Sequence, residues 1–118
     1  MPDLTRLERA ALAEIARQHP TLAPQAATAR VTVRENTGCG FFTTLAVDPA
    51  AAAAIEGPRV LGNVWLDVEG LEHPMTFLVF MEGGYMQCLE GATVGDSTET
   101  LDLGALVSAG VHEGVRHG

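Results

Sequence analysis

The pattern of hydrophobic positions in residues 60–90 predicts three consecutive antiparallel strands. Residues 75–82 are apolar at nearly every position and rich in residue types that suit a pleated surface, which is typical of a central strand. Gly83 and Gly84 follow directly and match a two-residue hairpin, whose positive φ angles glycine adopts without strain. Residues 85–90 then return beside the central strand, so this part of the chain predicts a meander.

Two segments alternate between apolar and polar positions, at 29–35 and at 60–68. Successive side chains of a strand point to opposite faces, so such alternation predicts one buried and one exposed face. The residues predicted to face inward are Val31, Val33, Val60, Val64, Leu66 and Val68, and those predicted to face outward are Arg30, Thr32, Arg34, Asn63, Trp65 and Asp67.

An amphipathic helix is predicted at residues 4–18, where leucine, isoleucine and alanine recur at spacings of three and four. Thr5 and Glu8 have the spacing of a capping box at its start. Pro20 ends it, because proline cannot continue the ladder and pushes His19 out of helical angles.

The remaining segments are shorter, and glycine, proline and asparagine separate them. They are predicted as a linker at 21–27, a turn at 36–40, a strand at 41–47 that pairs with 29–35, a helical turn or a loop at 49–56, and a loop at 91–97. Residues 98–103 are predicted as a sixth, edge strand or as the approach to a brief helix at 103–108 capped by Asp102. Residues 112–118 are predicted to be a flexible tail.

These elements predict one α+β domain over residues 1–118, with the N-terminal helix packed on a curved antiparallel sheet of five or six strands. Leu78 and Phe80 are expected on the opposite face of the central strand from Phe77 and Val79. One helix cannot cover both faces. The second face must therefore close into a half-barrel or meet another molecule, and we expect a homodimer.

Charge is distributed unevenly along the 118-residue chain, whose net charge is −8. Residues 1–34 carry five arginines and three acidic residues, whereas residues 35–118 carry two arginines and twelve acidic residues. This balance disfavours nucleic-acid binding and suits a basic protein partner. There is no lysine, which excludes lysine-based chemistry.

The expected setting is cytoplasmic. No run approaches the ~18 apolar residues that span a bilayer, and residues 1–19 do not resemble a signal peptide. The two cysteines, Cys39 and Cys88, are too few for a disulfide framework and are expected to be free thiols.

One turn stands out as a candidate for chemistry, because two glycines flank Cys39. This geometry can expose a thiol, but no histidine lies nearby in the sequence to activate it. The alternative is a small, partly buried filler in a glycine-rich hairpin. The candidate residues of this turn and its surroundings are Arg34, Glu35, Thr37, Cys39 and Glu90. Of these, Arg34, Glu35 and Glu90 can form a charged cluster at one end of the sheet.

A second candidate site is a pocket enclosed by the curled sheet, with a lining of large apolar side chains. The candidate lining residues are Trp65, Phe77, Met81, Tyr85 and Met86, which otherwise form plain core. No metal site is predicted: His112 and His117 are five residues apart rather than four, and His19 and His73 are read as solvated turn residues. No cofactor is indicated.

Residues 34–43, read Arg-Glu-Asn-Thr-Gly-Cys-Gly-Phe-Phe-Thr, and the later Leu89-Glu90-Gly91 form a recognisable pattern. It resembles a group of small bacterial proteins of unassigned function that share such a turn and a later Leu-Glu-Gly. The resemblance covers roughly residues 31–96. It implies a bacterial, cytoplasmic setting and an antiparallel sheet, and it carries over no catalytic residue.

Three functions are compatible with these patterns. The first is a non-enzymatic protein-interaction module, acting as a homodimer or as an acidic, immunity-like partner of a basic protein. The second is a carrier of a small apolar ligand. The third, which we place last, is an enzyme that uses Cys39 with Glu35 or a histidine as its base.

Overall fold

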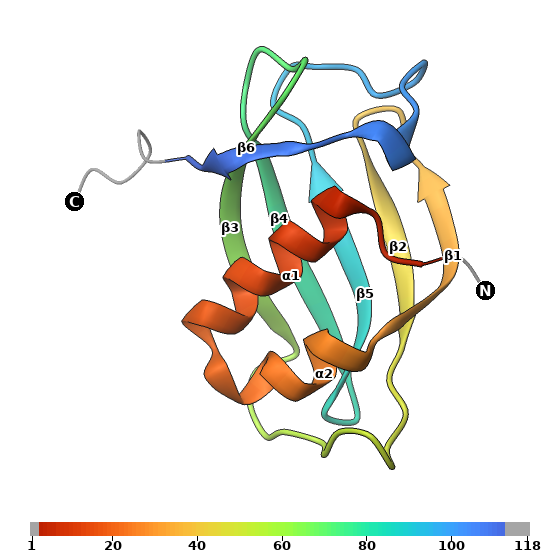
Figure 1. The fold of residues 1–118 in the computed structure, drawn as a ribbon, viewed down its shortest axis with the longest axis vertical. Coiled ribbons are helices and arrows are strands. Elements are labelled where there is room, and N and C mark those ends of the chain that lie inside the picture. Colours follow the sequence, from red (N-terminus) through yellow and green to blue (C-terminus); the bar gives the residue numbers. More distant parts are fainter. Residues whose placement is uncertain (1–2, 113–118) are drawn as a thin grey trace.

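The computed structural model describes residues 3–112, which form an α+β fold built on one open, antiparallel six-stranded sheet (Figure 1). The strands occur in the chain as β1 (Arg30–Asn36), β2 (Gly40–Ala46), β3 (Val60–Val68), β4 (Met75–Glu82), β5 (Tyr85–Ala92) and β6 (Ser108–Val111). Their order in the sheet is β1-β2-β5-β4-β3-β6, and every neighbouring pair is antiparallel.

Two predicted units of the sheet are confirmed. β1 and β2 form a hairpin, and β3, β4 and β5 form the meander, with Gly83 and Gly84 at φ of 59° and 87° in its second turn. The long-range pairing of β2 with β5 joins the two units. This pairing leaves β1 at one edge of the sheet and the short β6 at the other.

The helices all pack on one side of the sheet (Figure 1), and they are α1 (Arg6–Gln18), the 3₁₀ turn η1 (Pro20–Leu22) and α2 (Ala23–Thr28). The apolar stripe of α1 meets β3 and β4 in a core that includes Leu7, Ala11, Ile15, Val64, Leu66, Phe77 and Val79. The shortest extent of the molecule is 19 Å. That thickness accommodates one helix layer and one sheet layer, since packed layers lie about 10 Å apart.

Glu8 attaches α1 to the sheet through a fully buried carboxylate. It completes the predicted capping box, because Oε1 accepts from the backbone N–H of Thr5 (2.8 Å) while Thr5 Oγ1 accepts from the N–H of Glu8. Arg34 of β1 donates to both carboxylate oxygens at 2.7 Å, and the Thr43 hydroxyl of β2 donates to Oε2. Four donors thus occupy the acceptor sites of one carboxylate.

Gln25 has a comparable role at the other end of the helical layer. Its buried side-chain amide donates to the carbonyls of Ala53 and Gly84 and accepts from the N–H of Met86. One amide therefore links α2, the loop after β2 and the β4–β5 hairpin.

Two predicted elements are corrected. The linker predicted at 21–27 is largely helical, because Pro24 lies in the first turn of α2, where its missing N–H has no intrahelical partner to lose. Residues 98–103 do not form the edge strand. The predicted alternative, a brief helix capped by Asp102, is confirmed as the 3₁₀ turn η2 (Leu103–Ala105), which ends at residue 105 rather than 108. The sixth strand lies later, at Ser108–Val111.

Bulges reverse part of the predicted facing in two strands. The register of β1 shifts between Val31 and Val33, so Val31 is buried as predicted while Val33 faces outward with 58% of its surface exposed. Arg34 consequently points inward, toward Glu8.

The second bulge lies in β3 between Gly62 and Val64, with Asn63 at a φ of 67°. It buries Leu61 and leaves Val60 on the exposed face, contrary to the prediction for Val60. One inserted residue changes which face the side chains on either side of it occupy.

The last described strand, β6, is held to β3 beyond their shared ladder. The N–H of His112 donates to the carbonyl of Trp65, and the His112 ring lies 2.8 Å from Asp67 Oδ1. Residues 113–118 of the predicted tail lie outside the described residues. No helix of the described chain is long and apolar enough to cross a membrane.

We expect Glu8→Gln to lower the free energy of unfolding by about 3–5 kcal/mol, because it leaves the partly buried Arg34 guanidinium without its counter-charge. Glu14→Gln is the matched control. Glu14 also pairs with an arginine, but the Arg17 side chain is 70% exposed, and the expected loss is about 0–1 kcal/mol. Urea unfolding at pH 7 measures both, and equal losses would contradict the anchoring role of Glu8.

The Glu8 contribution should also depend on pH. Burial alone would raise the pKa of Glu8, but its hydrogen bonds from Arg34, Thr43 and Thr5 outweigh burial and lower the pKa below 4.5. A carboxylate whose pKa is lower in the folded state than in the unfolded state stabilises the fold at pH values above its unfolded-state pKa. This stabilisation is lost as the pH falls through the folded-state pKa. The stability difference between wild type and Glu8→Gln should therefore shrink as the pH is lowered from 5 toward 3, and a constant difference would contradict this assignment.

Candidate functional site

The face of the sheet opposite the helices, here called the outer face, carries two rows of side chains defined by the strand register. Running from β1 to β3, the first row is Glu35, Phe42, Glu90, Leu78 and Gly62, and the second is Val33, Thr44, Cys88, Phe80 and Val60. Trp65 lies next to Thr76 in a further row. Apolar side chains thus dominate the middle of this face.

The outer face is open in the described chain. Val33, Val60 and Phe42 expose 58%, 43% and 37% of their surfaces, and Leu78 and Phe80 are only partly buried. The neighbouring inward residues of β4, such as Phe77 and Val79, have no exposed surface. The sheet therefore has one sealed face and one apolar face in contact with water.

Phe42 lies between two carboxylates on this face. Its cross-strand neighbour on β1 is Glu35, and its neighbour on β5 is Glu90. Directly opposed residues of antiparallel strands have Cβ atoms about 5 Å apart, so an aromatic ring is flanked by two negative groups. No member of the two rows is a cation, so this part of the outer face combines apolar surface with negative charge.

The charged cluster expected from Arg34, Glu35 and Glu90 is divided between the two faces. Arg34 lies on the helix side and pairs with Glu8, whose carboxylate raises the pKa of the guanidinium through hydrogen bonds and charge. Glu35 and Glu90 lie on the outer face. Arg34 is therefore part of the scaffold, and the two acids are the members that remain on the outer face.

Thr37 and Cys39 lie in the β1–β2 turn, at the end of the hairpin. The N–H of Thr37 donates to the carbonyl of Gly40, and Cys39 is exposed. Within residues 3–112 the Cys39 thiol has no hydrogen-bond or ion-pair partner. A nucleophilic thiol requires an adjacent base, so the geometry gives Cys39 no catalytic arrangement.

Thr98, which was predicted to begin either an edge strand or the approach to a brief helix, fixes this turn. Its buried hydroxyl accepts from the N–H of Gly40 and contacts Asn36 Oδ1 at 2.8 Å, and its own N–H donates to the carbonyl of Gly38. A Cβ on Gly40 would lie 1.9 Å from the carbonyl oxygen of Gly91, so only glycine fits there. The sequence indicated a turn at the glycines, but it did not indicate that Thr98, 58 residues after Gly40, binds that turn.

The predicted pocket lining is not gathered into one cavity wall. Phe77 and Met81 are buried on the helix side of β4, whereas Trp65 pairs with Thr76 and lies on the outer face. Tyr85 opens β5 opposite Glu82, beside the Gly83–Gly84 turn, and Met86 is buried. These side chains divide between core, outer face and hairpin, which gives no support to a shared apolar ligand pocket.

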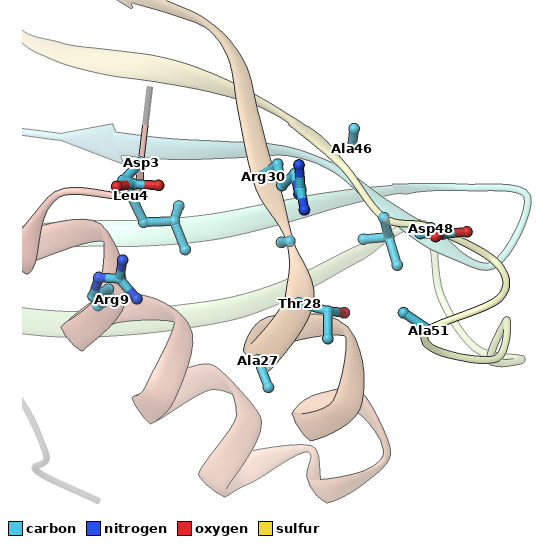
Figure 2. Close-up of a pocket in the computed structure, with 11 residues that line it drawn as sticks. Asp3, Leu4, Arg9, Ala27, Thr28, Arg30, Ala46, Asp48 and Ala51 are labelled. Atoms are coloured by element: carbon cyan, nitrogen blue, oxygen red, sulfur yellow. The ribbon is translucent and has the colours of Figure 1, made fainter. Parts of the chain in front are cut away.

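A cavity of about 920 Å³ lies beside the edge of the sheet where α1, α2 and β1 meet (Figure 2). Figure 2 shows Arg9 rising from α1, Arg30 from the start of β1, and Asp48 and Ala51 from the loop after β2. Its other lining residues are Asp3, Leu4, Ala27, Thr28, Ala29, Ala46 and Val47. Sequence reasoning missed this site because its walls come from four segments with no common motif.

Two loops bring Glu72, His73 and Asp96 together, with potential ligand atoms all within 4.8 Å of one another. The Asp96 carboxylate already accepts from the backbone N–H groups of Glu72 and His73, at 3.4 and 3.0 Å. These two hydrogen bonds hold the two loops together and explain why the three side chains lie close to one another. His73 is therefore a turn residue with a carboxylate neighbour, a pairing that its position in the sequence did not indicate.

Comparisons of the chain with protein-family models, with curated proteins and with solved structures yield no match.

The two thiols should differ in reactivity. Burial raises the pKa of the Cys88 thiol, and the negative charge of Glu90 raises it further. A hydrogen bond with the backbone of Thr43 lowers this pKa, but by less than burial raises it. Cys39 is exposed. In single Cys→Ser variants at pH 8, we expect iodoacetamide to modify Cys39 faster than Cys88, because the raised pKa lowers the thiolate fraction of Cys88 and its partial burial limits access of the reagent.

Glutathione, measured in parallel, provides the reference for an unactivated thiol. A Cys39 rate close to that of glutathione is expected, and a much faster one would reinstate Cys39 as a nucleophile. Equal rates for the two cysteines would contradict the partial burial of Cys88.

Proposed function

We propose that the protein is a non-enzymatic interaction module that binds a basic partner protein through the outer face. The observation that carries the proposal is the open apolar surface around Phe42, with Glu35 and Glu90 on either side. Burying such a surface removes apolar area from water, at about 25 cal/mol per Å², and favours association.

Charge favours a basic partner over a second copy of the chain. The chain carries a net charge of −8, so two copies would meet with like charge. Arg34, the cation nearest to the paired acids in sequence, is turned to the other side and neutralised by Glu8. A self-complementary interface would need a cation opposite Glu35 and Glu90, and neither row supplies one.

The local chemistry also suggests what the partner presents. A guanidinium that stacks on an aromatic ring gains cation–π attraction, and a carboxylate on either side can accept its N–H groups. An arginine surrounded by apolar side chains would satisfy Phe42, Glu35 and Glu90 together. The sharpest form of the proposal is an acidic, immunity-like protein that masks a basic patch of its target.

Site-specific photo-cross-linking in the producing cell tests the proposal. A photoreactive phenylalanine at Val33, the most exposed apolar residue of the outer face, should cross-link a basic protein. The same label at Val94, which is 46% exposed but lies outside the strands, is the matched control and should not. Glu35→Gln with Glu90→Gln should reduce the Val33 cross-link about tenfold or more, as expected for losing charge-assisted bonds at a binding centre.

The alternative outcomes are distinct. A cross-link to a second copy of the chain, with a dimer in sedimentation, would replace the basic partner by self-association. A yield at Val33 no higher than at Val94 would overturn the interaction role. An equal yield in the Glu35 and Glu90 variant would contradict the part of the proposal that rests on charge.

A further inference from the structure

The cavity beside α1, α2 and β1 is separate from the outer-face rows and plays no part in the function proposed above. Its volume of about 920 Å³ is within the range of about 300–1,000 Å³ typical of small-molecule sites. Leu4 and Val47 give it apolar wall, while Arg9, Arg30, Asp3 and Asp48 give it charge (Figure 2).

Four of the five arginines of residues 1–34 fall into two groups. Arg34 and Arg17 form ion pairs with Glu8 and Glu14. Arg9 and Arg30 both line the cavity, and their side chains have no hydrogen-bond or ion-pair partner among residues 3–112. Two guanidinium groups without an ion-pair partner in the described chain, from separate elements of an acidic protein, therefore line one cavity.

The acids of the cavity do not neutralise these arginines. The Asp48 carboxylate accepts from the N–H of Ala50, and no ion pair joins Asp3 to Arg9 in the described chain. Guanidinium groups bind carboxylate and phosphate oxygens in paired hydrogen bonds, while unpaired carboxylates accept from hydroxyl and amino groups. The lining thus offers guanidinium groups for the oxyanion of a polar organic molecule and carboxylates for its hydroxyl or amino groups.

We propose that this cavity binds a small organic anion, with its oxyanion held by Arg9 and Arg30 and its hydroxyl or amino groups directed toward Asp3 and Asp48. The oxyanion is a phosphate or a carboxylate, which share this chemistry. The apolar wall at Leu4 and Val47 accommodates the carbon skeleton.

NMR titration of the full chain with inorganic phosphate and, separately, acetate at constant ionic strength tests this site. The side-chain Nε–H signals of Arg9 and Arg30 and the amides of residues 28–30 should shift and saturate at millimolar concentration. Arg9→Gln and Arg30→Gln should each weaken the tighter anion about tenfold, as expected for one lost charge-assisted contact. Arg6→Gln, an exposed arginine of the same helix outside the cavity, is the matched control and should have no effect.

Tighter binding of phosphate would assign the oxyanion as a phosphate, and tighter binding of acetate would assign a carboxylate, and either supports the site. Shifts at Arg6 as large as those at Arg9, or shifts that never saturate, would show general ion association and overturn the proposal. All variants alter exposed side chains, and their amide spectra report whether the fold is intact.

Discussion

The buried carboxylate of Glu8 is the interaction on which the two-layer arrangement depends. It starts α1 through the capping box, and it binds β1 through Arg34 and β2 through Thr43. A carboxylate taken out of water is costly unless its acceptor sites are filled, and here they are filled from three different elements. The same bonds that make burial tolerable also fix the start of α1 to the β1–β2 hairpin, while the helix packs across β3.

That attachment determines which side of the sheet is sealed. Glu8 holds α1 on one face, and Gln25 does the same for α2 through the β4–β5 hairpin. With the helices all on this side, the apolar residues of the opposite side, Phe42 and Phe80 among them, remain in contact with water. The openness of the outer face follows from how the helices are anchored.

The sequence was sufficient for the elements whose signal is local. The helix and its cap, the hairpin glycines at 83–84 and the antiparallel meander all follow from spacing and residue type. The pairing of β2 with β5 was not readable, because no motif encodes it and even its nearest partners in sequence, Thr44 and Cys88, are far apart in the chain. The partners of Thr98 and Gln25 were hidden for the same reason.

In each of the two bulged strands, the predicted faces hold on only one side of the bulge. Alternation correctly placed Val31 and Val64, but the inserted residues at Thr32 and Asn63 reversed Val33, Arg34 and Val60. The candidate site was affected most, since the reversal of Arg34 removed it from the acidic pair and gave it a structural role. The two acids were named from the sequence, but the aromatic ring between them was not.

The bulge in β1 has a consequence for how this chain behaves beside its own copies. β1 is an edge strand, and a long, regular edge offers unpaired backbone groups on which further strands can add, which is the route to fibrils. The register shift at Thr32 and the charges of Arg30 and Glu35 interrupt that template. The bulge that made the predicted faces of β1 wrong beyond Val31 therefore also protects the edge of the sheet against the addition of further strands.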